Sequence, residues 1–292
     1  NSWRASLLRQ LYAETKRALR RGLENPVDKQ DWIDDTQVLA IEHLEDHGFT
    51  EAEVRKIWGD TGEDYFLREK VDDIVWQTEA ITRHTDTSKP IVLIKESSEV
   101  EFEGATQIFI HSRSSNTLFA LMASALEQLD LNIQDARIYN NGRGFTLYSF
   151  YVLDSNGHPI GDNAARIKHI EAFLFDQLQN MDQYAEVIKR RTPRQLRLFS
   201  IPTRTSMTTD HTRGHSILEV MTPDRPGLLA RIGKIFFDFN IHLQNAKIAT
   251  LGERVEDLFF VTDANQQAIE DPQLCEAIQA AIRKELDEQA AA

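Results

Sequence analysis

TQIFIHSRSSNTLFALMASALEQLDLNIQDARIYNNG, residues 106–142, recurs without a gap 110 residues later as SILEVMTPDRPGLLARIGKIFFDFNIHLQNAKIATLG, residues 216–252. Identical residues occupy matching positions: Ala120 and Ala230, Gln134 and Gln244, Ala136 and Ala246, Ile138 and Ile248, Gly142 and Gly252. After a slip of one residue, SFYVLD (149–154) aligns with LFFVTD (258–263). Self-similarity over this length indicates one structural unit present twice.

Each copy has the pattern strand, helix, strand, strand, helix. In the first copy the strand TQIFIHS precedes a helix with an apolar inner face, made of Leu118, Leu121, Met122, Ala125, Leu126 and Leu129. A hairpin with the turn signal Asn141-Gly142 follows, and then an amphipathic helix from about Asn163 past Met181. The second copy repeats this order. A helix pair on one face of an antiparallel sheet is the ferredoxin-like α+β arrangement, which we predict for both copies.

A fourth strand is expected in each copy, but the second copy ends in a helix over about 272–286. The segments PIVLIKE (90–96) and IPTRTSMTT (201–209) precede the two copies and are themselves about 110 residues apart. We therefore expect strands over 91–96 and 203–209 at equivalent places in the two sheets. The pattern leaves open whether each strand stays in its own copy or is exchanged between copies.

The first ninety residues have a helical pattern instead. Residues 1–26 place apolar side chains on one stripe and basic ones on the other, which predicts a helix with a solvated basic face. Gly48 is a typical helix stop, and Thr50 with Glu53 has the pattern of a capping box at the next helix start. HTDTSKP (84–90) resembles a linker. The predicted domains are a helical segment over 1–88 and two α+β domains over 89–200 and 201–292.

Composition narrows the possible partners and environment. The chain has 292 residues, a formal net charge of −13 and one cysteine. So acidic a chain is not expected to bind nucleic acid or an anionic membrane. A lone cysteine suits a reducing cytosol, and no apolar run is long enough to span a bilayer, so we expect a cytoplasmic protein. Asn1 at the start and three alanines at the end suggest a piece of a longer protein.

The segment TPDRPGLLARIG (222–233) joins a strand end, a tight turn and a helix start. Pro226 fits the first helical turn, and Gly227 removes the side chain where the chain bends. A helix N-terminus placed in this way receives anions, so the turn can bind a phosphate or a carboxylate, or only cap its own helix. The pattern GxxxxGK[ST] is absent, and phosphate is the least favoured of the three.

The motif MTPDRPGLLARIG, continued by NIHLQNAKIATLGERVEDLFFVTD, resembles an ACT domain, a βαββαβ regulatory module that binds free amino acids. The tandem pair, preceded by NSWRASLLRQLYAETKRAL and YFLREKVDDIVWQTEAI, resembles the C-terminal region of bacterial bifunctional protein-P-II uridylyltransferase/uridylyl-removing enzymes. In that family the ACT pair senses glutamine and favours removal of uridylyl groups from P-II over their addition. The resemblance covers essentially the whole chain.

The catalytic signatures of that family are missing from this sequence. None of the nine histidines is followed by Asp, none of the 13 glycines by Ser, and no Asp-x-Asp occurs. We therefore expect no catalytic residue, metal ligand or cofactor in this chain, and Mg²⁺ only in catalytic domains that it does not include. The resemblance implies that the chain begins just after the HD domain.

The resemblance also implies where glutamine binds. Amides near Gly227 would donate to its α-carboxylate, Asp224 would accept from its ammonium or only cap the helix, and Asn245 would pair with its side-chain amide or only across the sheet edge. The expected ligand-binding residues are Asp224, Arg225, Pro226, Gly227, Leu228, Leu229, Asn245 and Ala246.

The first copy has SRSSNTLF in place of this loop. Polar caps remain but the glycine is absent, so this second site is expected to be weak, altered or closed. Its residues are Ser114, Asn116, Thr117, Leu118 and Asp135. His211 and His215 flank a short loop, and two histidines without a third ligand predict a solvated loop and not a metal site.

Three functions remain open at this point. The first is a glutamine-sensing regulatory region whose partners are glutamine and, through the parent enzyme, the P-II protein. The second is an interaction or dimerisation module whose ACT sheets pair within or between chains and bind no small molecule. The third, an enzyme in its own right, is disfavoured by the missing signatures.

Overall fold

The computed structural model describes residues 26–59, 61–97, 104–141, 144–181, 202–211, 213–251 and 254–291. The predicted basic helix near the N-terminus lies outside these residues. Four helices begin the described chain: α2 (Pro26–Asp46), α3 (Glu51–Trp58), α4 (Glu63–Arg68) and α5 (Val71–Arg83). Gly48, with φ of 89°, follows α2, and Thr50 and Glu53 form the predicted capping box at the start of α3.

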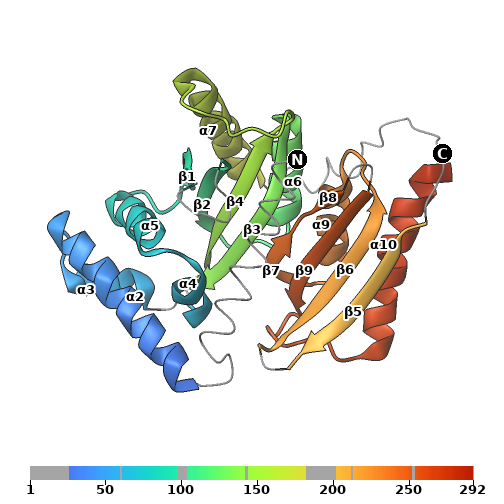
Figure 1. The fold of residues 1–292 in the computed structure, drawn as a ribbon, viewed down its shortest axis with the longest axis horizontal. Coiled ribbons are helices and arrows are strands. Elements are labelled where there is room, and N and C mark those ends of the chain that lie inside the picture. Colours follow the sequence, from blue (N-terminus) through green and yellow to red (C-terminus); the bar gives the residue numbers. More distant parts are fainter. Residues whose placement is uncertain are drawn as a thin grey trace.

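The described strands form one nine-stranded sheet (Figure 1). The first repeat contributes β1 (Ile91–Glu96), β2 (Thr106–Arg113), β3 (Leu131–Asn141) and β4 (Phe145–Asp154). The second contributes β5 (Arg204–Asp210), β6 (His215–Pro223), β7 (His242–Lys247), β8 (Thr250–Leu251) and β9 (Arg254–Thr262). The order is β1-β2-β4-β3-β7-β9-β6-β5, with β8 paired to β9. The two repeats therefore lie side by side, each in mirrored strand order, and join through β3 and β7.

The predicted extra strands are confirmed. β1 pairs antiparallel with β2, and β5 pairs antiparallel with β6, at opposite edges of the sheet. Each strand thus stays in its own repeat, which settles the alternative that the sequence left open. The two repeats differ in burial, because β2 is buried at all but its last residue whereas β6 alternates between buried and half-buried residues.

The junction of the repeats has approximate two-fold symmetry. β3 and β7 pair antiparallel, and Ala136 lies opposite Ala246, its equivalent in the other repeat. Both strands carry a register irregularity at equivalent places, between Ile133 and Asp135 and between Leu243 and Asn245. The two repeats thus present the same strand to each other, and an axis passes between the paired alanines.

One face of the sheet carries the helices of both repeats. They are α6 (Leu118–Gln128), α7 (Ala164–Gln179), α9 (Leu228–Asp238) and α10 (Pro272–Ala291). Their apolar side chains share one core with the inner side chains of both halves of the sheet. α6 and α9 pack closely, because a Cβ on Gly233 would lie only 2.9 Å from the Cα of Ala120.

The opposite face is covered only in part among the described residues. Helices α2–α5 form a second core with Phe109, Tyr139 and Leu147 of the first repeat. In Figure 1 these helices lie on the side of β1–β4, away from β5, β6 and β9. This difference explains why β2 is buried on both faces and β6 on one.

Candidate functional site

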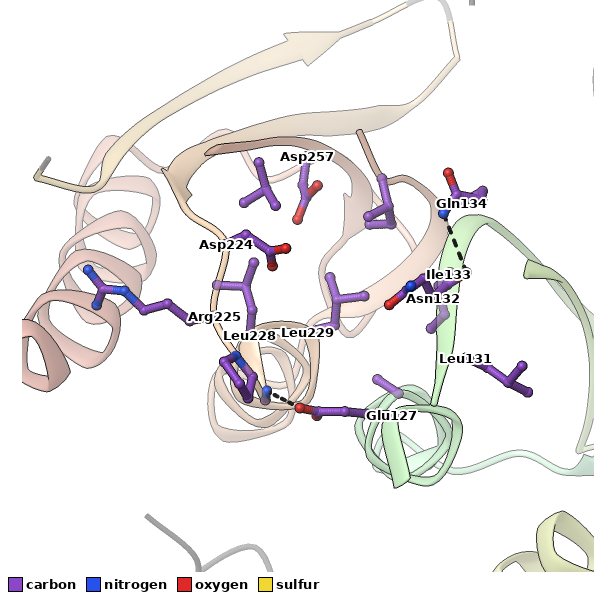
Figure 2. Close-up of a pocket in the computed structure, with 15 residues that line it drawn as sticks. Glu127, Leu131, Asn132, Ile133, Gln134, Asp224, Arg225, Leu228, Leu229 and Asp257 are labelled. Atoms are coloured by element: carbon purple, nitrogen blue, oxygen red, sulfur yellow. Dashed lines mark hydrogen bonds between the residues drawn. The ribbon is translucent and has the colours of Figure 1, made fainter. Parts of the chain in front are cut away.

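A cavity of about 300 Å³ lies between the two repeats, at the start of α9 (Figure 2). One wall is the loop 224–229 of the second repeat with Ile248, Val255 and Asp257 behind it. The other wall is the end of α6 and the start of β3 in the first repeat, where Glu127 and residues 131–134 lie. The side-by-side junction of β3 and β7 brings these two walls together.

The loop has a conformation that explains its glycine. Gly227, which precedes α9, has φ of 76°, in the left-handed region that favours glycine. The amide of Leu228 donates to the carbonyl of Arg225 at 3.3 Å, which closes the turn. All six predicted loop residues, from Asp224 to Leu229, line the cavity.

The amide of Gly227 already binds a carboxylate. It donates to Oε1 of Glu127, in the last turn of α6, at 2.7 Å. Partial burial raises the pKa of Glu127, although the Gly227 amide and Arg231 act in the opposite direction. We did not identify Glu127 from the sequence. The signal that would have found it is the difference between repeats, since the equivalent residue is Phe237, which is 45% exposed.

Two aspartates face the cavity from the second repeat. Figure 2 shows the carboxyl groups of Asp224 and Asp257 directed into the same space. Asp257 is 0% exposed and lies on β9 between Val255 and Phe259, which belong to the apolar core. Sequence reasoning also missed this residue, although an acidic residue at an inward-facing position of an alternating strand was a usable signal.

The cavity is also lined by one arginine and by two residues with side-chain amides. Arg225 turns away, because its Nη1 donates to the carbonyl of Leu286 on α10 at 2.6 Å. Asn132 and Gln134 line the wall formed by β3. Their amides can both donate and accept hydrogen bonds. The cavity therefore combines three carboxyl groups, two side-chain amides and an apolar wall.

Asn245 and Ala246 do not line this cavity. Asn245 lies opposite Arg137 in the β3–β7 ladder, and its Oδ1 lacks a hydrogen-bond partner among the described residues. Ala246 lies opposite Ala136 in the helix-covered core. The two residues that the sequence suggested thus lie outside the cavity, whose polar wall on the first repeat is formed by Asn132 and Gln134.

The loop of the first repeat has no left-handed turn. Thr117 precedes α6 with φ of −86°, and Leu118 is fully buried. The hydroxyl of Ser114 bonds that of Thr146 at 2.8 Å, and Asn116 donates to Asn240 at the same distance. These polar groups are bound within the protein itself.

Asp135 serves a different part of the molecule from this loop. Its Oδ2 accepts from Nε of Arg137 at 3.2 Å. Arg137 contacts the carbonyl of Arg68 and the carboxylate of Glu69, both of the helical segment. Thus Asp135 lies in the interface with that segment and not with the loop residues of the suggested second site.

The described ranges contain neither a metal-binding cluster nor a membrane-spanning helix. Their His, Cys, Asp and Glu side chains form no group that could hold a metal ion, and His211 forms an exposed pair with Glu270 at 3.3 Å. Nor does any described helix have the length and apolar character needed to cross a bilayer.

Two regions of the chain match known domain families. Residues 28–80 match the fifth domain of the uridylyltransferase GlnD, and residues 216–278 match the ACT domain. The first region covers most of helices α2–α5. The second includes the loop that lines the cavity.

Whole-chain relatives extend the match. The chain is 52% identical over 288 residues to a bifunctional uridylyltransferase/uridylyl-removing enzyme of Pseudomonas aeruginosa (strain LESB58), covering 99% of the chain and 32% of that protein. The enzyme of the same description from Ectopseudomonas mendocina (strain ymp) is 53% identical over 291 residues, covering 100% and 32%. That from Stutzerimonas stutzeri (strain A1501) is 51% identical over 289 residues, covering 99% and 32%. The chain thus spans about one third of the length of the curated relatives it matches.

Proposed function

We propose that this chain is a regulatory region that senses glutamine. Essentially its whole length matches about one third of the length of bifunctional uridylyltransferase/uridylyl-removing enzymes. In this proposal the parent enzyme adds uridylyl groups to the P-II protein and removes them in the cytoplasm, and glutamine favours removal. The chain itself carries out no catalytic step, since neither catalytic signature occurs in its sequence.

The hydrogen bond between Gly227 and Glu127 carries this proposal. This bond supports the interpretation that the loop binds a carboxylate. At the start of a helix, backbone amides and the helix dipole favour negative charge. A free amino acid presents the same group and would replace Glu127. The side-chain amide of glutamine would then face Asn132 and Gln134. Their nitrogens donate to the carbonyls of Asp154 and Asn132, and their side-chain oxygens can accept from its NH₂ group.

Titration calorimetry with glutamine tests the proposal. Gly227→Val adds a branched side chain at a positive φ, and its Cβ would lie 3.4 Å from Nε of Arg231, so we expect binding to be lost. Gly214→Val is the matched control, because Gly214 also has a positive φ of 69° but no atom within 4 Å of its added Cβ. Thr117→Val changes the equivalent residue of the first repeat and should keep binding.

Loss of binding in Gly227→Val alone would support the site. If glutamine binds wild type and Gly227→Val equally, the loop is only a helix cap and the sensor lies elsewhere. Circular dichroism of each variant separates a blocked site from a misfolded chain.

A second candidate is an interaction module. Ile217, Leu258 and Phe260 lie half-buried on the face of the second repeat that no described helix covers. The equivalent face of the first repeat is covered by α2–α5. Such an apolar patch favours a protein partner. Sedimentation of wild type and Phe260→Glu, alone and with P-II, would detect self-association or complex formation that depends on this face.

A further inference from the structure

Asp257 is an unusual residue to bury at the cavity. It is 0% exposed, and its Oδ1 accepts a 3.3 Å hydrogen bond from the amide of Ala249. Its Oδ2 is buried and has no partner among the described residues. A buried carboxylate with one satisfied oxygen is costly unless it is neutral or meets a cation.

None of the described residues that line the cavity offers such a cation to Oδ2. Arg225 lines the cavity but directs its guanidinium to the carbonyl of Leu286. Asp224, on the loop, adds negative charge beside Asp257, and Glu127 of α6 lines a more distant part of the same cavity. A ligand with a positively charged nitrogen is therefore the natural complement of Oδ2.

We propose that Asp257 is a specificity-determining residue that accepts the ammonium of the bound ligand. The cavity then selects α-amino acids over the 2-oxo and 2-hydroxy acids of the same length, which carry a carboxylate but no ammonium. This inference rests on the proposed function for the location of the site. It adds the residue that discriminates the ligand's charge.

The layout of the cavity suits both charged groups of an amino acid. Figure 2 shows Asp224 and Asp257 on one side of the space and Glu127, which accepts from the Gly227 amide at the start of α9, on the other. The carboxylate and the ammonium of an α-amino acid sit on the same carbon. One ligand can therefore replace Glu127 at the Gly227 amide and offer its ammonium to the two aspartates.

Binding by this route is coupled to a proton. Burial, with a smaller contribution from Asp224, raises the pKa of Asp257 to about 7, while the amide of Ala249 acts in the opposite direction. An ammonium at Oδ2 favours the ionised carboxylate and lowers that pKa. Ligand binding near pH 7 should therefore release a proton, and the affinity should fall as the pH drops below 7.

Calorimetry of the full chain tests this coupling. Glutamine is titrated between pH 6 and pH 8 in buffers of different ionisation enthalpy, beside 4-carbamoylbutanoate, which is glutamine without its amino group. We expect proton release with glutamine and no binding of the analogue. Asp257→Asn should lower the affinity at pH 8 by roughly 10-fold to 100-fold, because a charge-assisted hydrogen bond is lost, and should abolish proton release.

Asp263→Asn, on an exposed turn with no contact to the cavity, is the control and should behave as wild type. Unchanged affinity and proton release in Asp257→Asn would overturn the inference, as would equal binding of the analogue. If Asp257→Asn fails to fold, the pH dependence of wild-type binding decides the matter.

A panel of the other free amino acids separates this inference from the proposed function. If glutamine does not bind but another amino acid does, with proton release that requires Asp257, the proposed function fails and the inference stands. If no α-amino acid binds with proton release, the inference is overturned.

Discussion

At the residue scale, Glu127 of the first repeat contacts the loop of the second repeat at the cavity. Its carboxylate accepts a hydrogen bond from the Gly227 amide, so a ligand carboxylate must compete with it. Replacing Glu127 by Leu should strengthen glutamine binding several-fold, and should lower stability by about 1 kcal/mol because the amide loses its acceptor. Calorimetry and urea denaturation measure the two effects.

Glu171→Gln, a partly buried glutamate of α7 outside the cavity wall, is the matched control and should change neither quantity. Weaker glutamine binding in Glu127→Leu would mean that Glu127 helps to hold the ligand.

Asp257 should also set the pH dependence of stability. Its pKa is raised to about 7 in the folded protein, so folding favours its neutral form. Its favourable contribution is complete below the unfolded pKa, is lost as the pH rises toward 7, and is absent above it. Asp257→Asn should therefore gain stability relative to wild type as the pH rises, by up to a few kcal/mol at pH 8.

Urea denaturation of both proteins between pH 5 and pH 8 measures this difference. A stability difference that does not change with pH would show that Asp257 keeps an ordinary pKa.

At the element scale, the contact of α6 with α9 depends on the absence of a side chain. A Cβ on Gly233 would lie 2.9 Å from both Cα and Cβ of Ala120, closer than packed atoms allow. Gly233→Ala should therefore destabilise the protein by about 1–3 kcal/mol, although alanine is the better helix former. Gly62→Ala is the control, since no atom lies within 4 Å of its added Cβ.

Thermal denaturation followed by circular dichroism compares the two variants. Equal melting temperatures for Gly233→Ala and wild type would mean that the helices separate at no cost.

At the scale of the whole molecule, a buried polar network joins the helical segment to the central strand of the sheet. Arg137 on β3 donates to the carbonyl of Arg68 at 3.1 Å and to Glu69 at 3.4 Å, and Tyr139 donates to Glu69 at 2.8 Å. β3 also lines the cavity with its first residues. One strand thus touches both the proposed ligand site and the helical segment.

Arg137→Leu should cost about 3–5 kcal/mol of stability, because it leaves Glu69 buried without its cation. It should also speed amide hydrogen exchange over residues 63–83, which pack against this network. Arg213→Leu removes an exposed arginine from the turn between β5 and β6, away from this network, and should have a much smaller effect. Equal effects of the two variants would show that the network does not anchor the segment.

The sequence by itself determined the local elements and their duplication. The repeat spacing predicted the paired α+β units and the strands β1 and β5, because period and turn signals are local properties of a chain. The glycine of the loop was also identifiable, since a left-handed turn before a helix requires it.

Only the tertiary structure decided which residues meet at the cavity. Leu243 and Ala246 both lie in the helix-covered core although three positions separate them, because β7 carries a register irregularity between Leu243 and Asn245. Regular alternation from Leu243 would have placed Asn245 on the helix-covered face. The bulge shifts the alternation by one residue, so Asn245 lies on the opposite face, away from the cavity. Glu127 reaches the loop only because β3 and β7 pair edge to edge, and such pairing depends on contacts far apart in sequence, which no local pattern encodes.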